Sequence, residues 1–154
     1  MSTQEEQAKS SIANLLESNE DQLYEELGMR AKAQAQDTAK GGTFEPLITY
    51  DAKQMGALDE IRKFGWRLFN RWLVEAHKLL CGSDPADKEE RQKVAKAFAV
   101  DETTVGAAVA ALLISQLGLA AALAAVVAAI LVKRFFYPTY ELFCESLREN
   151  LPRD

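Results

Sequence analysis

The strongest constraint on this chain is the segment from Val105 to Val132, where 28 consecutive positions carry no charged side chain and 11 of them are alanine. Only Ser115 and Gln116 are clearly polar within it. A run this apolar is found either as the buried centre of a helical protein or as a segment that enters a lipid bilayer. The rest of the chain must therefore fold around this segment or accompany it to a membrane.

The segment is expected to form a helical hairpin. Leu117 and Gly118 permit a turn in its middle, which divides the region of about 104–134 into helices over about 104–116 and 119–134. At 1.5 Å per residue these helices would span about 20 Å and about 24 Å, whereas the hydrocarbon core of a bilayer is about 30 Å thick. In the second helix, large side chains share one face and alanines the other, so both faces are expected to pack against neighbours.

The hairpin resembles in general form the hydrophobic helical hairpin of pore-forming colicins, which is buried in the soluble state of those proteins. The resemblance implies that such a hairpin could leave its covering helices and enter a membrane. Alanine-rich hairpins also occur as plain structural cores. Two interpretations follow: a permanently buried core, which is the leading one, and constitutive or triggered membrane insertion.

Apolar residues recur at helical spacing on both sides of the hairpin. They predict amphipathic helices near 10–35, 54–80, 85–99 and 139–150. Gly28 and Gly65 lie inside the first two and are points where a helix could be interrupted. We predict an all-α fold in which residues 1–154 form a single domain, a helical bundle of about five to six helices around a central alanine-rich hydrophobic hairpin.

The connection at 40–52 contains Gly41, Gly42 and Pro46, which break the helical pattern. It includes the only strand-like residues of the chain, and a lone strand would have nothing to pair with. We therefore expect an ordered connecting loop that the side chains of Phe44, Leu47 and Tyr50 attach to the helices.

The composition gives little support for nucleic-acid binding. A net charge of −5 provides no general attraction to phosphate. Residues 94–113 are similar in rhythm to a DNA-binding helix-turn-helix, but their second half carries almost only valine, glycine, alanine and leucine. Such side chains cannot form hydrogen bonds with base edges or phosphates. No nucleic-acid partner is expected.

Residue types needed for catalysis or metal binding are also scarce. Cys81 and Cys144 are far apart, and His77 is the only histidine, so no metal site is predicted. No nucleophile motif and no phosphate-binding glycine loop is present, so we expect no catalytic residue, no cofactor and no small-molecule substrate. The N-terminus does not resemble a signal peptide, which predicts a cytoplasmic protein, with membrane association as the alternative, and both thiols reduced and packed as small hydrophobes.

One further stretch, residues 62–73, interleaves basic and aromatic side chains. This pattern suits an anionic membrane surface or single-stranded nucleic acid, although an aromatic stripe with arginine and lysine at its rim is more typical of a helix packed on a core. Gln116 lies next to the expected hairpin turn, where its polar side chain would oppose entry into lipid. The candidate membrane or partner surface consists of Arg62, Lys63, Trp66, Arg67, Arg71 and Gln116.

Together these features predict a non-enzymatic soluble helical protein that acts in protein interaction or assembly, through a protein partner or through self-association. The alternative is a membrane-active helical protein whose hairpin inserts into lipid. An enzyme with a site assembled from distant residues is the third hypothesis.

Overall fold

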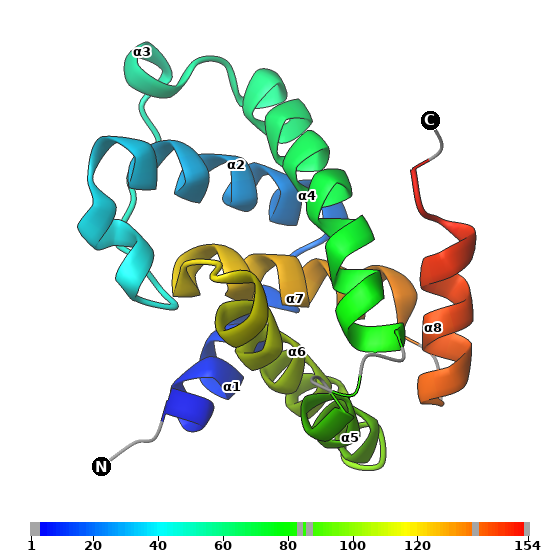
Figure 1. Cartoon of the computed structure of the whole chain (residues 1–154). Helices are drawn as coiled ribbons and strands as arrows, with labels where there is room; N and C mark the ends of the chain where they lie inside the picture. The colour runs from blue at the N-terminus through cyan, green and yellow to red at the C-terminus, as the bar shows by residue number, and fades with distance from the viewer. Residues whose placement is uncertain (1–3, 83–84, 86–87, 137–138, 153–154) are drawn as a thin grey trace.

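The computed structural model describes residues 4–82, 85, 88–136 and 139–152. Within these ranges the chain forms eight α-helices and one short 3-10 helix and no β-strand, which confirms the all-α fold. The elements are α1 (Gln4–Leu15), α2 (Glu20–Gln36), the 3-10 helix η1 (Thr38–Gly42), α3 (Ala52–Met55), α4 (Leu58–Cys81), α5 (Lys88–Ala97), α6 (Glu102–Leu117), α7 (Ala121–Phe135) and α8 (Tyr140–Glu149). In Figure 1, α7 lies in the middle of the molecule and the other helices surround it.

Helix α7 is the centre of the hydrophobic core. Twelve of its 15 residues are buried, and they include large side chains such as Leu123 and Ile130 as well as alanines such as Ala125 and Ala129. Both faces of α7 are therefore covered by protein, as we predicted from the large side chains on one face and the alanines on the other. Helix α6 is covered less completely, because its residues Ala111, Ser115 and Gln116 are exposed.

The two helices of the hairpin, α6 and α7, begin and end within two residues of the predicted bounds. The carboxylate of Asp101 accepts a hydrogen bond of 2.7 Å from the backbone N–H of Thr104 and caps the start of α6. Gly118 ends α6 with a φ of +69°, a conformation that glycine adopts without a steric penalty. The turn between α6 and α7 thus depends on one glycine.

The number of helices exceeds the five to six predicted, because the expected helix near 10–35 is two helices. Asn19 interrupts it: its side chain accepts a hydrogen bond of 2.8 Å from the backbone N–H of Gln22, and the side chain of Gln22 accepts one of 2.9 Å from the N–H of Asn19. This reciprocal cap starts α2. In the same way, the predicted helix over 54–80 is divided, since Gly56 ends the single turn of α3 before α4 begins at Leu58.

Gly28 and Gly65 do not interrupt their helices but allow two helices to touch. A Cβ atom at Gly65 would lie 3.1 Å from the backbone nitrogen of Gly28 and would overlap the carbonyl oxygen of Tyr24. A Cβ atom at Gly28 would overlap the carbonyl oxygen of Ile61. Helices α2 and α4 therefore cross with their backbones in contact, which only residues without a side chain permit.

The loop over 40–52 is attached differently from the prediction. Phe44 is buried as expected, but Leu47 is 88% exposed and Tyr50 is 39% exposed, so those two expectations are wrong. Polar contacts hold this part of the loop instead. Lys40 Nζ donates a hydrogen bond of 2.7 Å to the carbonyl oxygen of Leu47, and the hydroxyl of Tyr50 donates one of 2.7 Å to the carbonyl oxygen of Gly56.

The prediction of two reduced thiols is also wrong. Cys81 at the end of α4 and Cys144 in α8 form a disulfide, with their Cα atoms 5.7 Å apart. Beside the disulfide, the Phe98 ring contacts the rings of Phe136, Tyr140 and Phe143 at centroid distances of 5.3–5.8 Å. The two cysteines are 63 residues apart in sequence, and that spacing does not indicate that they are close in the fold. They are brought together because α8 packs against α4.

Candidate functional site

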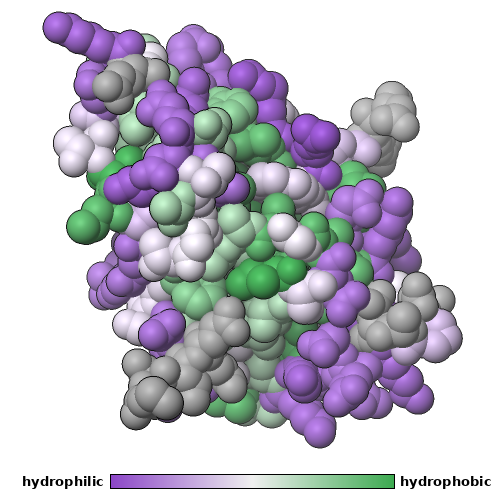
Figure 2. All heavy atoms as spheres, turned by 60° about the vertical axis from the view of Figure 1, so that its left-hand side comes forward, coloured by the Kyte–Doolittle hydropathy of each residue, from purple (hydrophilic) through white to green (hydrophobic). Residues whose placement is uncertain are grey.

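An apolar groove runs along α6 on the described surface. Helices α1 and α5 both pack against α6, and between them the groove has a volume of about 610 Å³. Its floor consists of small or aliphatic side chains of α6, and Val100, which is 66% exposed, lies at its edge. Figure 2 shows a band of hydrophobic residues between hydrophilic margins on the side of the molecule that carries α1 and α2.

The two rims of this groove differ in charge. Lys93 and Lys96 of α5 form one rim, where Lys93 pairs with Glu90 at 3.9 Å and Lys96 makes no ion pair with any described residue. Phe44 belongs to the opposite rim, and Glu6 and Glu45 lie with it around an adjoining depression. The groove therefore separates a basic edge from an acidic one. We call the groove and these two edges the α6 groove, the basic rim and the acidic rim.

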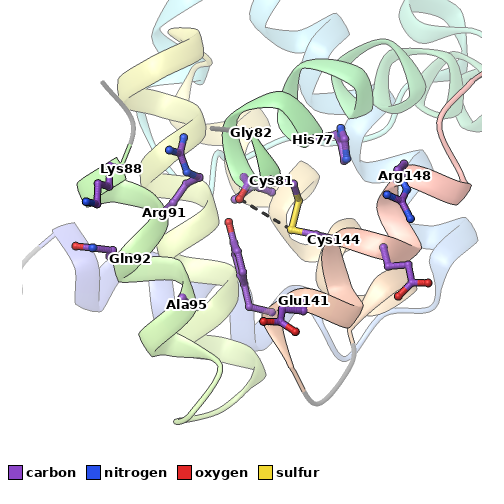
Figure 3. A pocket seen from close by; sticks show the side chains of 13 residues that line it. His77, Cys81, Gly82, Lys88, Arg91, Gln92, Ala95, Glu141, Cys144 and Arg148 are labelled. Atoms are coloured by element: carbon purple, nitrogen blue, oxygen red, sulfur yellow. Dashed lines mark hydrogen bonds between the residues drawn. A yellow bond between two sulfur atoms is a disulfide. The ribbon is translucent and has the colours of Figure 1, made fainter. Parts of the chain in front are cut away.

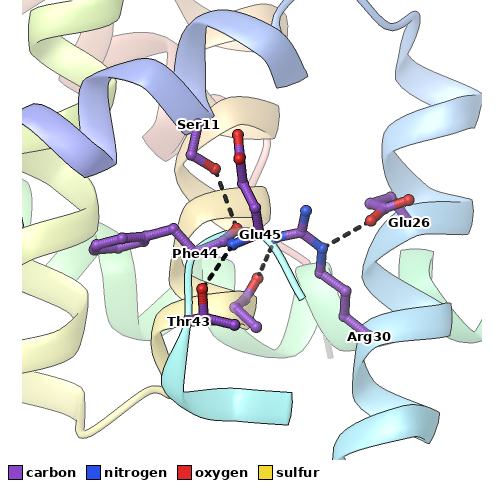
Figure 4. A network of polar contacts seen from close by, with 7 residues as sticks. Ser11, Glu26, Arg30, Thr43, Phe44 and Glu45 are labelled. Carbon is purple, nitrogen blue, oxygen red and sulfur yellow. Dashed lines mark hydrogen bonds and ion pairs between the residues drawn. The ribbon is translucent and has the colours of Figure 1, made fainter. Parts of the chain in front are cut away.

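A buried arginine fixes the acidic rim to the core. Arg30 of α2 is 5% exposed, and its Nε donates a hydrogen bond of 2.8 Å to the carboxylate of Glu26. One of its terminal nitrogens donates to two carbonyl oxygens, that of Phe44 at 2.8 Å and that of Ala122 at 3.0 Å. The hydroxyl of Ser11 also donates to the Phe44 oxygen, so Phe44 is tied to α1, α2 and, through Arg30, to the start of α7 (Figure 4). Charged hydrogen bonds of this kind give the rim a defined position.

Three of the six predicted surface residues form an exposed patch on α4. Trp66 is 50% exposed, and Arg67 and Arg71 are exposed as well. Neither arginine forms an ion pair with a described residue. Their spacing places them on one broad side of the helix. We call these three residues the α4 patch.

The other predicted residues lie elsewhere or are neutralised. Lys63 is exposed beside the α4 patch, but its Nζ is 3.8 Å from the carboxylate of Glu60. Arg62 turns toward α2 and pairs with Glu25 at 3.4 Å and with Asp59 at 2.9 Å. Gln116 is exposed near the end of α6 and belongs to a different part of the surface. The structure therefore brings together only part of the predicted set.

A second opening surrounds the Cys81–Cys144 disulfide. It has a volume of about 700 Å³ and lies between the end of α4, α5 and α8. Figure 3 shows Arg91 of α5 and Arg148 of α8 on opposite sides of the disulfide. Lys88, His77 and Tyr140 also line this opening, as do Glu141 and Glu145. We call it the disulfide pocket.

Burial and nearby cations both affect the titrating side chains of the disulfide pocket. The pKa of His77 is lowered by desolvation and, to a smaller extent, by the positive charge of Arg148. The pKa of Tyr140 is raised by desolvation, which the positive charge of Arg91 partly opposes. The hydroxyl of Tyr140 is buried and has no hydrogen-bond partner among the described residues. At neutral pH it is a protonated donor.

The described residues show no other arrangement typical of a reactive site. No group of three or more histidine, cysteine, aspartate or glutamate side chains among them could hold a metal ion. None of the described helices is by itself long and apolar enough to cross a membrane; α7 and α8 together meet that criterion but are bent by 96° where they join. No protein-family model matches the chain, and neither a curated protein nor a solved structure matches it.

Sequence reasoning missed both openings. The α6 groove exists because α1 and α5 leave one side of α6 uncovered, and no local pattern distinguishes Ala111, which is exposed, from Ala110, which is fully buried. The disulfide pocket draws on three helices that are distant in sequence. Only the α4 patch had a local signal, in its alternation of basic and aromatic residues.

Proposed function

We propose that this protein is a non-enzymatic assembly protein that associates with a second copy of itself through the α6 groove. The observation that supports this most is the groove, which leaves Val100 and Ala111 exposed beside the largely buried hairpin. Apolar area that is open to water and bordered by polar rims is typical of interaction surfaces. The alanine side chains of its floor would let a second helix approach closely.

The charges at the rims favour a second copy as the occupant. A two-fold axis that runs along α6 would place the basic rim of one copy over the acidic rim of the other, and it would do so twice. Lys93 and Lys96 of each copy would then face Glu6 and Glu45 of its partner. A two-fold axis across α6 would instead oppose like charges. Complementary charges of this kind determine the orientation of a complex more than its affinity.

Replacing Ala111 with arginine is expected to weaken self-association at least about tenfold, because a charged side chain would have to be buried in the dimer. Sedimentation equilibrium over a range of protein concentrations measures the dissociation constant. Ala13→Arg is the matched control, since Ala13 is exposed on α1 and does not line the groove. A wild-type protein that remains monomeric at all concentrations, or equal effects of both variants, would contradict the proposal.

Exchange of the rim charges tests the orientation of the two copies. In a dimer of Lys96→Glu, the introduced glutamate of each copy would face the acidic rim of the other. In a dimer of Glu45→Lys, the introduced lysine of each copy would face the basic rim of the other. Both dimers bring like charges together, so each variant should dimerise less than the wild type. A mixture of the two variants restores attraction at both contacts and should form heterodimers. If the mixture associates no better than either variant alone, the two-fold axis along α6 is incorrect.

A second candidate function is binding to an anionic membrane surface, which the α4 patch favours. An exposed tryptophan beside two arginines without acidic partners among the described residues matches the composition of interfacial membrane anchors. Insertion of the hairpin would require more than this contact, because α7 is covered on both faces. The α4 patch would serve as the first point of attachment.

Binding to vesicles tests this second function. Each arginine near an anionic surface contributes about 1 kcal/mol, so the double variant Arg67→Gln and Arg71→Gln should bind phosphatidylserine-containing vesicles roughly thirtyfold more weakly than the wild type. Co-sedimentation with vesicles measures this, and pure phosphatidylcholine vesicles should bind neither protein. The double variant Lys93→Gln and Lys96→Gln removes two charges from α5 and should retain binding. Equal losses in the two double variants would indicate a general charge effect and exclude the α4 patch.

A further inference from the structure

We propose that the Cys81–Cys144 disulfide is reversible and that the disulfide pocket is an exchange site for a small thiol that carries carboxylates, the chemical class of glutathione. The proposal concerns the pocket between α4, α5 and α8 and is independent of the α6 groove. It assigns a ligand class to side chains that the proposed assembly does not use.

The disulfide is accessible from the pocket. Both Cys81 and Cys144 are partly exposed, and both line the opening of about 700 Å³. Sites for small molecules commonly have volumes of about 300–1,000 Å³. A free thiol can therefore reach the sulfur atoms without unfolding of α4 or α8, a condition that a fully buried structural disulfide does not meet.

The charges and the hydrogen-bonding groups of the pocket favour a carboxylate. Three cationic side chains, Lys88, Arg91 and Arg148, line the pocket and outnumber its two carboxylates. Arg91 and Arg148 are also close enough to Tyr140 and His77, respectively, to act on their pKa values. The hydroxyl of Tyr140 is a buried donor that no described residue uses. An arginine and a neutral hydroxyl are donors that a carboxylate accepts from.

The exchange is chemically complete with two molecules of the small thiol. The thiolate of the first attacks one sulfur of the pair, the protein S–S bond breaks, and its electron pair leaves on the other sulfur, which takes a proton from water. This step forms a mixed disulfide between the protein and the thiol. A second thiolate then attacks the sulfur of the bound small molecule. The protein is left with two thiols and the small thiol is oxidised to its own disulfide.

This assignment also agrees with a cytoplasmic location, which is a prediction from the sequence. Disulfides in that compartment are generally transient and serve catalysis or redox sensing, because glutathione keeps most thiols reduced. An accessible pair in a pocket where cationic side chains outnumber acidic ones fits that class better than a permanent structural link. The state of the pair would then report the ratio of reduced to oxidised small thiol.

The rate of reduction by thiols of different charge tests the proposal. Native protein is incubated with glutathione, which is anionic, or with cysteamine, which is cationic, and free cysteines are alkylated and counted by mass spectrometry. Arg148→Gln should slow reduction by glutathione about fivefold, the effect of one unit charge a few ångströms away in water, and should not slow reduction by cysteamine. Arg91→Gln should do the same. Arg71→Gln, which removes the same charge from the outer side of α4, should change neither rate.

The rate of each variant is divided by the wild-type rate for the same thiol, so that the intrinsic reactivity of the thiol cancels. Arg148 is exposed, so its replacement is expected to leave the fold intact even where Arg91→Gln does not. Three results would overturn the proposal: equal changes of the glutathione and cysteamine rates, reduction only under unfolding conditions, or a purified, air-exposed protein in which both cysteines remain free.

Discussion

Replacing Gly65 with alanine should lower the free energy of unfolding by about 3 kcal/mol, near the upper end of the usual cost of overpacking a core. The added methyl group would overlap the carbonyl oxygen of Tyr24 and lie 2.8 Å from its carbonyl carbon. Both are backbone atoms of α2, so α2 and α4 would have to separate as whole helices. Alanine improves helix propensity by about 1 kcal/mol over glycine, which offsets only part of this cost.

Urea unfolding of the wild type and the variant measures this difference. Gly42→Ala provides the control, because a Cβ atom at Gly42 would have no neighbour within 4 Å. We expect it to change the unfolding free energy by less than about 0.5 kcal/mol. A loss below about 1 kcal/mol for Gly65→Ala would mean that the backbones of α2 and α4 do not touch at this crossing.

The two glycines illustrate what the sequence could and could not predict. Periodicity located the helices that contain Gly28 and Gly65, because apolar residues must line the side that faces the core. The same reasoning treated the glycines as weak points within each helix. Their actual role is a contact between two helices, and only the relative placement of α2 and α4 reveals it.

The hairpin could be predicted in more detail because its signals are local. Asp101 caps α6 and Gly118 ends it, and both act on residues within a few positions of themselves. The break at Asn19 is equally local, since Gln22 three residues later completes the reciprocal cap, so a search for this pairing would have found it. By contrast, the exposure of Leu47 depends on polar contacts of the loop backbone, for which no spacing rule exists.

The candidate sites follow the same division. Basic and aromatic residues in one helix indicated the α4 patch. Arg62 does not belong to it because it pairs with Glu25 of α2, a contact that the sequence of α4 alone cannot predict. Gln116 lies near the end of α6 on a different part of the surface, and nothing in a linear pattern relates it to α4. The α6 groove and the disulfide pocket arise from what neighbouring helices leave uncovered, which is a property of packing alone.

Replacing both cysteines with serine should lower the free energy of unfolding by about 4 kcal/mol, a larger loss than the one expected for Gly65→Ala. The disulfide joins residues 63 positions apart. In the chain-entropy description, a cross-link that closes a loop of this length removes conformational freedom from the unfolded state worth about 4 kcal/mol. The loss should therefore arise mainly from the unfolded chain, with little change in the helix content of the folded protein by circular dichroism.

Reductant provides an internal check on this expectation. Addition of dithiothreitol should lower the denaturant midpoint of the wild type to near that of Cys81→Ser/Cys144→Ser, and it should leave the midpoint of the double variant unchanged. The single variants Cys81→Ser and Cys144→Ser should each match the double variant, because either one removes the same cross-link. If reductant does not shift the wild-type midpoint while alkylation shows that both thiols have become free, then closure of this loop does not stabilise the fold, and the packing of Phe143 and Leu147 in the core is sufficient to hold α8 in place.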